Sequence, residues 1–270
     1  MSDLLATPNH SPAAPAGASP TSATALPGLS VVVPMFNESD CVAPLMAGLQ
    51  QVEDELGDRF HLEFLLVDDG SADDTVARVE AAAGERSHYV VLRHDQNRGI
   101  AAAIETGLRA ATYDVVASID CDGSYDLAEL EPMTRLLADG VDMVTASPYH
   151  PQGGVDNVPA WRLRISQLAT RMYGVAMGRR MTCYTSCYRV YRRPAVVNLP
   201  VQSAGFVGVA ELMCRLIASG GAVVEHPARL RSRVAGHSKM RVARASLGHL
   251  RLMASLFGSR FVPRRQRHDE

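Results

Sequence analysis

The sequence predicts an α/β fold in which a mostly parallel central sheet is flanked by helices. Short apolar runs rich in β-branched residues alternate with longer amphipathic segments, and no internal linker interrupts them. Such alternation is typical of βαβ units, whose strands align in parallel. Three acidic motifs follow three of the apolar runs. Because open α/β sheets bind ligands at the carboxyl ends of their strands, the three motifs are expected to share one site.

The first half of the chain alternates regularly. The apolar run at 29–35 includes Pro34 and predicts a buried strand, after which Ser39 can cap a helix running to about residue 56. A second run predicts a strand over 62–67, and Asp73 can cap the next helix, through residue 83. The same patterns predict strands over 89–93, 115–119 and 141–146, and helices over 99–111 and 127–138.

The second half is less regular. After a loop over 148–159 that contains Gly and Pro, the patterns predict helices over 161–177 and 206–218, and strands over 186–191, 222–225 and 228–234. Residues 241–257 form an amphipathic helix with a broad apolar face beside basic residues. Packing against the domain is the first expectation for this helix, and a membrane interface is the alternative.

Composition and charge divide the chain further. Residues 1–28 are rich in Ala, Pro, Ser and Thr, which predicts a disordered tail without the apolar core of a signal peptide. The sequence then predicts a single domain over 29–240, followed by the amphipathic helix over 241–258 and a basic disordered tail over 259–270. The net charge of −2 favours no particular partner, and no nucleic-acid partner is expected. The basic stretch from 229 to 268 is either a solvated surface or a contact for anionic lipid or a phosphorylated acceptor.

The cysteines and the hydropathy pattern indicate the compartment. Five cysteines, an odd number with no Cys-x-x-Cys pair, argue against a disulfide framework or a zinc site and favour a reducing compartment. No apolar stretch is long enough for a transmembrane helix. We therefore expect a cytoplasmic protein, with peripheral contact to the cytosolic face of a membrane.

The third acidic motif is the strongest chemical signal. Asp120 and Asp122 lie two residues apart, where an apolar strand ends. Both carboxylates can reach one hard cation, Mg²⁺ or Mn²⁺, which prefers oxygen ligands and keeps positions open for phosphate oxygens. A metal that bridges a diphosphate stabilises it as a leaving group. The pair therefore predicts an enzyme that uses a nucleotide-sugar, with Cys121 offering backbone atoms to the sugar.

The other two motifs suit the nucleotide. Glu38 and Asp69 are placed to accept hydrogen bonds from ribose hydroxyls or the base, while Pro34, Phe36 and Val67 provide apolar walls. Asp68 is expected to hold the turn at the strand end instead.

Three later residues suit phosphate and acceptor. Glu211 lies in an otherwise apolar helix, where a carboxylate is costly to bury without a partner, so it is either ion-paired or a site residue. Arg233 and Lys239 bracket a Gly-His-Ser segment from which cations can close over a pyrophosphate or an acceptor phosphate. His237 is the weaker candidate there. Lys239 is also the single lysine of the chain.

These motifs together resemble the family 2 glycosyltransferases of GT-A, Rossmann-like fold, over about residues 29–257. "VVVPMFNES", "LLVDDGSADDT", "NRGIAAAIETGL" and "SIDCDG" are similar to motifs found across that family. "SCYRVYRR", "GFVGVAEL" and "RVAGHSK" resemble segments of its dolichol-phosphate (polyprenyl-phosphate) mannosyltransferase branch.

The resemblance implies roles for particular residues. Catalysis falls to Asp122, Glu211, Arg233 and Lys239, and metal binding to Asp120 and Asp122. Nucleotide-sugar binding falls to Pro34, Phe36, Glu38, Val67, Asp69, Asp120, Cys121, Asp122 and Arg162. The implied reaction is an inverting, metal-dependent transfer from GDP-mannose or a UDP-hexose to a polyprenyl phosphate.

The chain departs from the family pattern at three places. Gly123 and Ser124 follow the paired aspartates where the family has Leu and then Gln or Ser. Pro148 replaces an arginine that contacts phosphate, and Cys183 replaces an acid. These changes lie on the sugar and acceptor side, so a family 2 enzyme with a soluble acceptor is the main alternative.

Two other classes are weaker. A nucleotide-sugar pyrophosphorylase needs a Gly-rich basic loop after the first strand, where this chain has the acidic "PMFNESD". A non-catalytic binding protein would not need Asp120, Asp122 and Lys239 intact. A dehydrogenase is excluded because no Gly-x-Gly-x-x-Gly follows the first strand.

Overall fold

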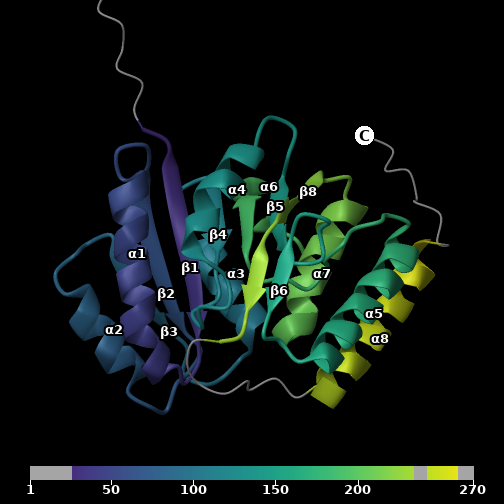
Figure 1. The fold of residues 1–270 in the computed structure, drawn as a ribbon, viewed down its shortest axis with the longest axis horizontal. Coiled ribbons are helices and arrows are strands. Elements are labelled where there is room, and N and C mark those ends of the chain that lie inside the picture. Colours follow the sequence, from purple (N-terminus) through teal and green to yellow (C-terminus); the bar gives the residue numbers. More distant parts are fainter. Residues whose placement is uncertain (1–25, 234–241, 261–270) are drawn as a thin grey trace, which may run out of the picture.

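A seven-stranded sheet forms the centre of the computed structural model, which describes residues 26–233 and 242–260 (Figure 1). The strands follow the order β3-β2-β1-β4-β7-β5-β8, and only β7 runs antiparallel to its neighbours. The predicted α/β class with a mostly parallel sheet is therefore confirmed. The strands are Gly28–Met35 (β1), His61–Asp68 (β2), Tyr89–Arg93 (β3), Val115–Ser118 (β4), Met143–Ser147 (β5), Gly154–Asp156 (β6), Arg189–Arg192 (β7), Val223–Pro227 (β8) and Arg229–Arg231 (β9).

Helices cover both faces of the sheet (Figure 1). They are Val42–Leu56 (α1), Thr75–Ala83 (α2), Ile100–Ala110 (α3), Leu130–Leu136 (α4), Ala160–Met177 (α5), Arg193–Val196 (α6), Gly205–Ala218 (α7) and Val242–Arg260 (α8), with 3-10 turns at Ser39–Cys41 and Leu127–Glu129. Among them α1, α2 and α4 pack on one face, and α3, α5 and α7 on the other.

The central strand β1 is apolar on both sides because it contributes to two hydrophobic cores. Val31 and Val33 join the core under α1, whereas Val32 joins the core under α3 and α7. Alternate strand residues point to opposite faces, so a continuous β-branched run is what a doubly covered strand requires.

Helix α3 packs very closely on β1 at one glycine. A Cβ atom placed on Gly107 would lie 2.3 Å from Cγ1 of Val32. The absence of a side chain there allows the Ala-rich helix to lie directly against the strand, which fixes the position of its N-terminus at the carboxyl edge of the sheet.

The C-terminal helix α8 packs against α5 and α7 (Figure 1), which is the first of its two expected arrangements. Leu252 and Met253 are buried in the core that α7 shares, and Nδ1 of His249 lies 2.7 Å from the Tyr173 hydroxyl. Burial lowers the pKa of His249. Hence α8 is part of the body that encloses the site.

Several expected elements differ in extent. The helix predicted over 127–138 is a 3-10 turn followed by α4, because Pro132 lies in the first turn of α4 and has no N–H to extend an earlier helix. The expected loop over 148–159 contains β6, which pairs with β9 in a separate two-stranded sheet. Strand β7 starts at Arg189 rather than 186, since residues before it turn toward the site.

The predicted tails lie largely outside the described residues, as do His237 and Lys239. Within the described part of the chain, no helix is long and apolar enough to cross a bilayer.

The close approach at Gly107 predicts a cost for any side chain there. Gly107→Val is expected to lower the free energy of unfolding by about 3 kcal/mol, because overpacking a tight core forces the helix off the strand. Urea denaturation measures this change. The control Ala110→Val, on the exposed side of the same helix, is expected to cost less than about 0.7 kcal/mol. Equal effects of the two substitutions would contradict the packing described here.

Candidate active site

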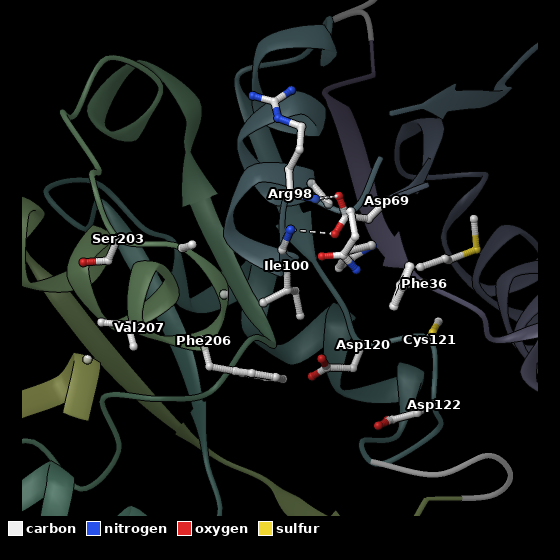
Figure 2. Close-up of a pocket in the computed structure, with 18 of the residues that line it drawn as sticks. Phe36, Asp69, Arg98, Ile100, Asp120, Cys121, Asp122, Ser203, Phe206 and Val207 are labelled. Atoms are coloured by element: carbon white, nitrogen blue, oxygen red, sulfur yellow. Dashed lines mark hydrogen bonds between the residues drawn. The ribbon is translucent and has the colours of Figure 1, made fainter. Parts of the chain in front are cut away.

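The carboxyl ends of β1, β2 and β4 meet at one cavity of about 750 Å³. These ends are adjacent because β1 pairs in parallel with both β2 and β4. Phe36, Asp69, Asp120 and Asp122 come from these ends and line the cavity, as Figure 2 shows. The three acidic motifs therefore do share one site. Pro34, Glu38 and Cys121 line it as well.

The carboxylate of Asp69 holds the turn before α3 while it lines the cavity. It accepts hydrogen bonds from the amides of Arg98 at 2.8 Å and Gly99 at 2.7 Å (Figure 2). Its Oδ1 also lies 2.7 Å from Nδ1 of His94. Gly99 has a φ of 93°, and a Cβ there would meet the backbone of Gly205. Asp69 thus fixes the wall of the cavity that α3 forms.

Two neighbouring residues of that motif are turned away from the cavity. Asp68 is fully buried and accepts a hydrogen bond from the Ser71 amide, which is the expected role in the turn. Val67 was expected to wall the nucleotide, but the structure places it in the core between the sheet and α3. Val67 lies two residues after Leu65 along β2, so both side chains point to the same face of the sheet, into the layer behind the site.

Asp120 and Asp122 form a negatively charged pair at the end of β4. Oδ1 of Asp122 accepts a hydrogen bond from the Ser124 amide at 2.9 Å, and this bond fixes the turn after the strand. Burial, together with the charge of Asp122, raises the pKa of Asp120 to about 7. Two close carboxylates in a buried position require a cation to remain ionised together.

The donor set of this pair fits Mg²⁺ or Mn²⁺. Carboxylate oxygens are hard ligands, and such cations keep water or phosphate oxygens in their remaining positions. In the described part of the chain, no group of three or more His, Cys, Asp or Glu side chains could hold a metal alone. A metal at this pair would therefore share its coordination with a ligand such as a diphosphate.

Arg233 connects two of the motifs. Its Nε lies 2.9 Å from Oδ2 of Asp122, and one terminal nitrogen lies 3.3 Å from Oε1 of Glu38. Burial opposes the charged guanidinium, but Asp122 and Glu38 outweigh it and raise the pKa of Arg233. The predicted phosphate-binding arginine is thus already drawn into the acidic end of the cavity.

The thiols near the site are protonated. Burial raises the pKa of Cys121 well above its ordinary value, and it raises the pKa of Cys41, whose thiol donates to Glu38, to about 12. All five cysteines are buried, and among the described residues none forms a disulfide. A thiolate nucleophile is therefore not available at neutral pH.

Glu211 lies behind the cavity rather than in its lining. It is 1% exposed, accepts the amides of Gln202 at 3.1 Å and Ser203 at 2.7 Å, and pairs with Arg215 one turn along α7. Burial opposes its charge, but the hydrogen bonds from Ser203 and Arg215 outweigh burial and lower the pKa of Glu211. Ion pairing, one of the two expected roles, is what the structure shows. Its carboxylate holds the segment that leads Ser203 and Gly205 into the cavity wall.

Arg162 lines a second cavity, of about 490 Å³, and not the first. It lies in the first turn of α5 beside Trp161. Among the described residues its Nε is buried without a hydrogen-bond partner. The structure therefore moves Arg162 from the expected nucleotide pocket to a neighbouring one, because the helix that carries it packs beyond α7.

A third cavity, of about 180 Å³, lies beside Asp120 and Asp122. Asp122, Phe206 and Arg233 line all three cavities, so the three spaces meet there. Phe206 is a site residue that sequence reasoning missed, although it is the second residue of the noted "GFVGVAEL" segment. Three spaces that meet at a carboxylate and a cation suit a reaction between two bound molecules, one of them a phosphate ester.

Comparisons with known proteins agree with this geometry. The model for glycosyl transferase family 2 matches residues 30–199, and the chain belongs to this family. It is therefore a glycosyltransferase, with a GT-A fold.

Two relatives show how far the sequence similarity extends. The chain is 32% identical over 223 residues to polyprenol monophosphomannose synthase of Mycolicibacterium smegmatis, covering 78% of this chain and 80% of that protein. It is also 32% identical over 166 residues to an undecaprenyl-phosphate 4-deoxy-4-formamido-L-arabinose transferase of Klebsiella pneumoniae. That match covers 61% of this chain and 49%, about half, of the relative.

Solved structures support the fold. Glucosyl-3-phosphoglycerate synthase of Mycobacterium tuberculosis, in complex with Mn²⁺ and UDP, is similar with a TM-score of 0.65 and 19% identity. The match covers 88% of this chain and 82% of that one.

The role of Asp122 predicts a loss of metal-dependent binding. Asp122→Asn is expected to abolish Mn²⁺-dependent binding of a nucleoside diphosphate while the circular dichroism spectrum stays unchanged, because one of two anionic ligands is removed. Asp126→Asn is the matched control, since Asp126 follows Asp122 by four residues and pairs with Arg231 but lies outside the first cavity. Unchanged affinity in Asp122→Asn with Mn²⁺ present would refute the assignment.

The buried contacts of Glu211 predict a positioning role. Glu211→Gln is expected to weaken nucleoside diphosphate binding about tenfold, because charge-assisted hydrogen bonds that hold the cavity wall are lost. Titration calorimetry measures the affinity, and turnover of bound donor should change less. Glu105→Gln, which breaks an exposed pair with Arg109 at the same spacing, is the control. Full loss of turnover with unchanged binding would instead indicate a direct chemical role.

Proposed function

We propose that the protein transfers a sugar, with inversion, from a nucleotide-sugar to a polyprenyl phosphate. The observation that carries this proposal is the meeting of three cavities at Asp122, Phe206 and Arg233. The first cavity suits the nucleotide, the second suits the acceptor, and the third, which is the smallest of the three, suits one sugar ring. The donor is GDP-mannose or a UDP-hexose.

The named relatives support the acceptor class. One is a polyprenol monophosphomannose synthase, and another is an undecaprenyl-phosphate 4-deoxy-4-formamido-L-arabinose transferase. Both names refer to a polyprenyl phosphate or its product. The similarity of this chain to the first extends over most of both proteins.

The second cavity suits the phosphate and the first part of a polyprenyl chain. Arg162 and Arg231 provide positive charge in its lining, while Trp161, Ile165 and Leu230 provide apolar surface. An arginine binds a phosphate through two parallel hydrogen bonds, and the buried Nε of Arg162 is a donor in need of a partner. This combination of charges and apolar walls matches an amphiphile better than a sugar.

The reaction follows from this arrangement as a single displacement. An oxygen of the acceptor phosphate attacks the anomeric carbon, and the bond from that carbon to the nucleoside diphosphate breaks, which inverts the configuration. A phosphate monoester has a second pKa of about 6, so it needs no strong base near neutral pH. Arg233 and, as the resemblance implies, Lys239 stabilise the departing diphosphate.

The metal is Mg²⁺ or Mn²⁺, and Asp120 and Asp122 are the residues that would hold it. When bound, such an ion supplies positive charge to the leaving diphosphate. The similar structure that contains Mn²⁺ and UDP supports this part of the proposal. Glu38 and Phe36 then remain for the nucleoside.

Peripheral membrane contact fits the surface formed by α5 and α8. Trp161, Leu168 and Val175 of α5 and Leu247 and Leu250 of α8 are about half exposed or more. The sequences of both helices contain arginines and no acidic residue. An apolar face with a positive rim suits an anionic bilayer, on the cytoplasmic side.

A donor screen tests the function. With Mn²⁺ or Mg²⁺, release of nucleoside diphosphate is expected only when a short polyprenyl phosphate is present, and with one donor. The matching polyprenol without phosphate is the control acceptor. Release with a soluble acceptor but not with the lipid would move the chain to the alternative class of family 2 enzymes.

A substitution in the second cavity tests whether that cavity binds the acceptor. Arg162→Ala is expected to raise the KM for the lipid phosphate about tenfold while donor affinity stays the same, because a charge-assisted contact is lost. Arg180→Ala removes an exposed arginine beyond the end of α5 and is expected to change neither constant. An equal loss of donor affinity in Arg162→Ala would indicate that Arg162 binds the nucleotide, as the sequence predicted, and not the acceptor.

A further inference from the structure

His94 follows β3 directly and lies behind the wall of the first cavity. Because β3 pairs in parallel with β2, with Arg93 opposite Asp68, the next residues of the two segments, His94 and Asp69, are neighbours. The amide of His94 also donates to the carbonyl of Asp68 at 2.9 Å, which extends the pairing by one residue. The His94 side chain is only 5% exposed, and it lines none of the three cavities.

Both nitrogens of the His94 ring have partners. Nδ1 lies 2.7 Å from Oδ1 of Asp69, and Nε2 lies 2.9 Å from Oγ1 of Thr106. An ionised carboxylate only accepts hydrogen bonds, so Nδ1 carries a proton and donates it to Asp69. Nε2 of the neutral ring is then an acceptor, and the Thr106 hydroxyl donates to it. The three side chains therefore form a chain of hydrogen bonds that ends on the carboxylate.

Helix α3 brings Thr106 to this place. Thr106 is next to Gly107, where the helix packs directly on β1. The amides of Arg98 and Gly99, just before the same helix, donate to Asp69. The carboxylate is thus held from both ends of the packed part of α3, at its N-terminus directly and at Thr106 through the His94 ring.

Three hydrogen bonds leave the Asp69 carboxylate with one acceptor position. Oδ1 accepts from the Arg98 amide and from His94, which uses both of its lone pairs, while Oδ2 accepts from the Gly99 amide. Asp69 lines the first cavity. Among the described residues, the second lone pair of Oδ2 is therefore the one from which Asp69 can accept a hydrogen bond from a ligand.

We infer that His94 and Thr106 are positioning residues, which act through Asp69 and keep this acceptor position available to one donor group of the nucleoside. The inference rests on the donor half of the proposed function. A carboxylate that is already oriented loses little conformational freedom when a ligand binds, so its preorganisation contributes to affinity. The diphosphate is bound by other residues, Asp122 and Arg233 among them, so the nucleoside contact can be weakened separately.

Ligands with and without a nucleoside distinguish this role from a general loosening of the fold. UDP, GDP and inorganic pyrophosphate, each with Mn²⁺, are compared by titration calorimetry in the wild type and in His94→Leu. The variant is expected to bind the nucleoside diphosphate that the wild type prefers about tenfold more weakly, because the carboxylate is free to turn. Its affinity for pyrophosphate and its kcat should not change. An equal loss for pyrophosphate, or no loss for the nucleoside diphosphate, would overturn the inference.

Further variants keep the test decisive. His94→Asn retains an N–H group near the place of Nδ1 and is expected to bind the nucleoside diphosphate within about threefold of the wild type. Thr106→Val keeps the side-chain shape without the hydroxyl, and a loss of about threefold is expected even if His94→Leu does not fold. His61→Leu, at an exposed histidine outside the three cavities, is the matched control and should change nothing. A loss in His94→Asn as large as in His94→Leu would contradict the role of the N–H group.

Failure of the proposed function gives a different result. If the wild type binds neither UDP nor GDP with Mn²⁺, the donor half of the function is wrong, and the inference is wrong with it. If the wild type binds one of them and His94→Leu binds it equally well, the function stands and only the roles of His94 and Thr106 are wrong.

Discussion

The guanidinium of Arg233 joins the two acidic ends on which the site depends. It pairs with Glu38 after β1 and with Asp122 after β4, two residues that lie far from it in the sequence. Without this cation, the carboxylates of Glu38, Asp120 and Asp122 would repel one another in a partly buried space, which is unfavourable. The site is therefore preorganised around a positive charge before any ligand binds.

A small second sheet positions that cation. Strand β9 pairs with β6, and the amides of Arg231 and Ser232 donate to the carbonyls of Ser124 and Asp156. The carbonyl of Ser124 belongs to the turn that Asp122 itself stabilises. Backbone contacts of this kind hold Arg233 more firmly than the exposed ion pairs nearby, since exposed pairs contribute little to stability.

Local patterns were sufficient for most of the fold, and non-local contacts explain what they missed. The run at 29–35 and the alternation after it predicted β1 to β4 and their helices, because period and composition act within each segment. The pairing of β6 with β9 depends on residues 154–156 meeting 229–231, which no local pattern indicates. The interruption before α4 was visible in principle, since Pro132 marks it.

The residues expected to bind the donor could also be predicted in large part from local sequence patterns. Motifs at parallel strand ends must meet, so Glu38, Asp69 and Asp122 were expected together. Phe206 reaches the site from an element placed by tertiary packing alone, and it was not predicted. Glu211 illustrates the limit: the cost of burying its carboxylate predicted a partner, but not that the partners would be Arg215 and the amide of Ser203.

The central claim is that nucleotide, sugar and acceptor meet at Asp122, Phe206 and Arg233. A crystal structure with Mn²⁺, a non-transferable donor analogue and a short polyprenyl phosphate tests this most directly. The account predicts the anomeric carbon beside these three residues, the sugar in the third cavity and the lipid phosphate near Arg162. A sugar or lipid phosphate bound outside the three cavities would contradict it.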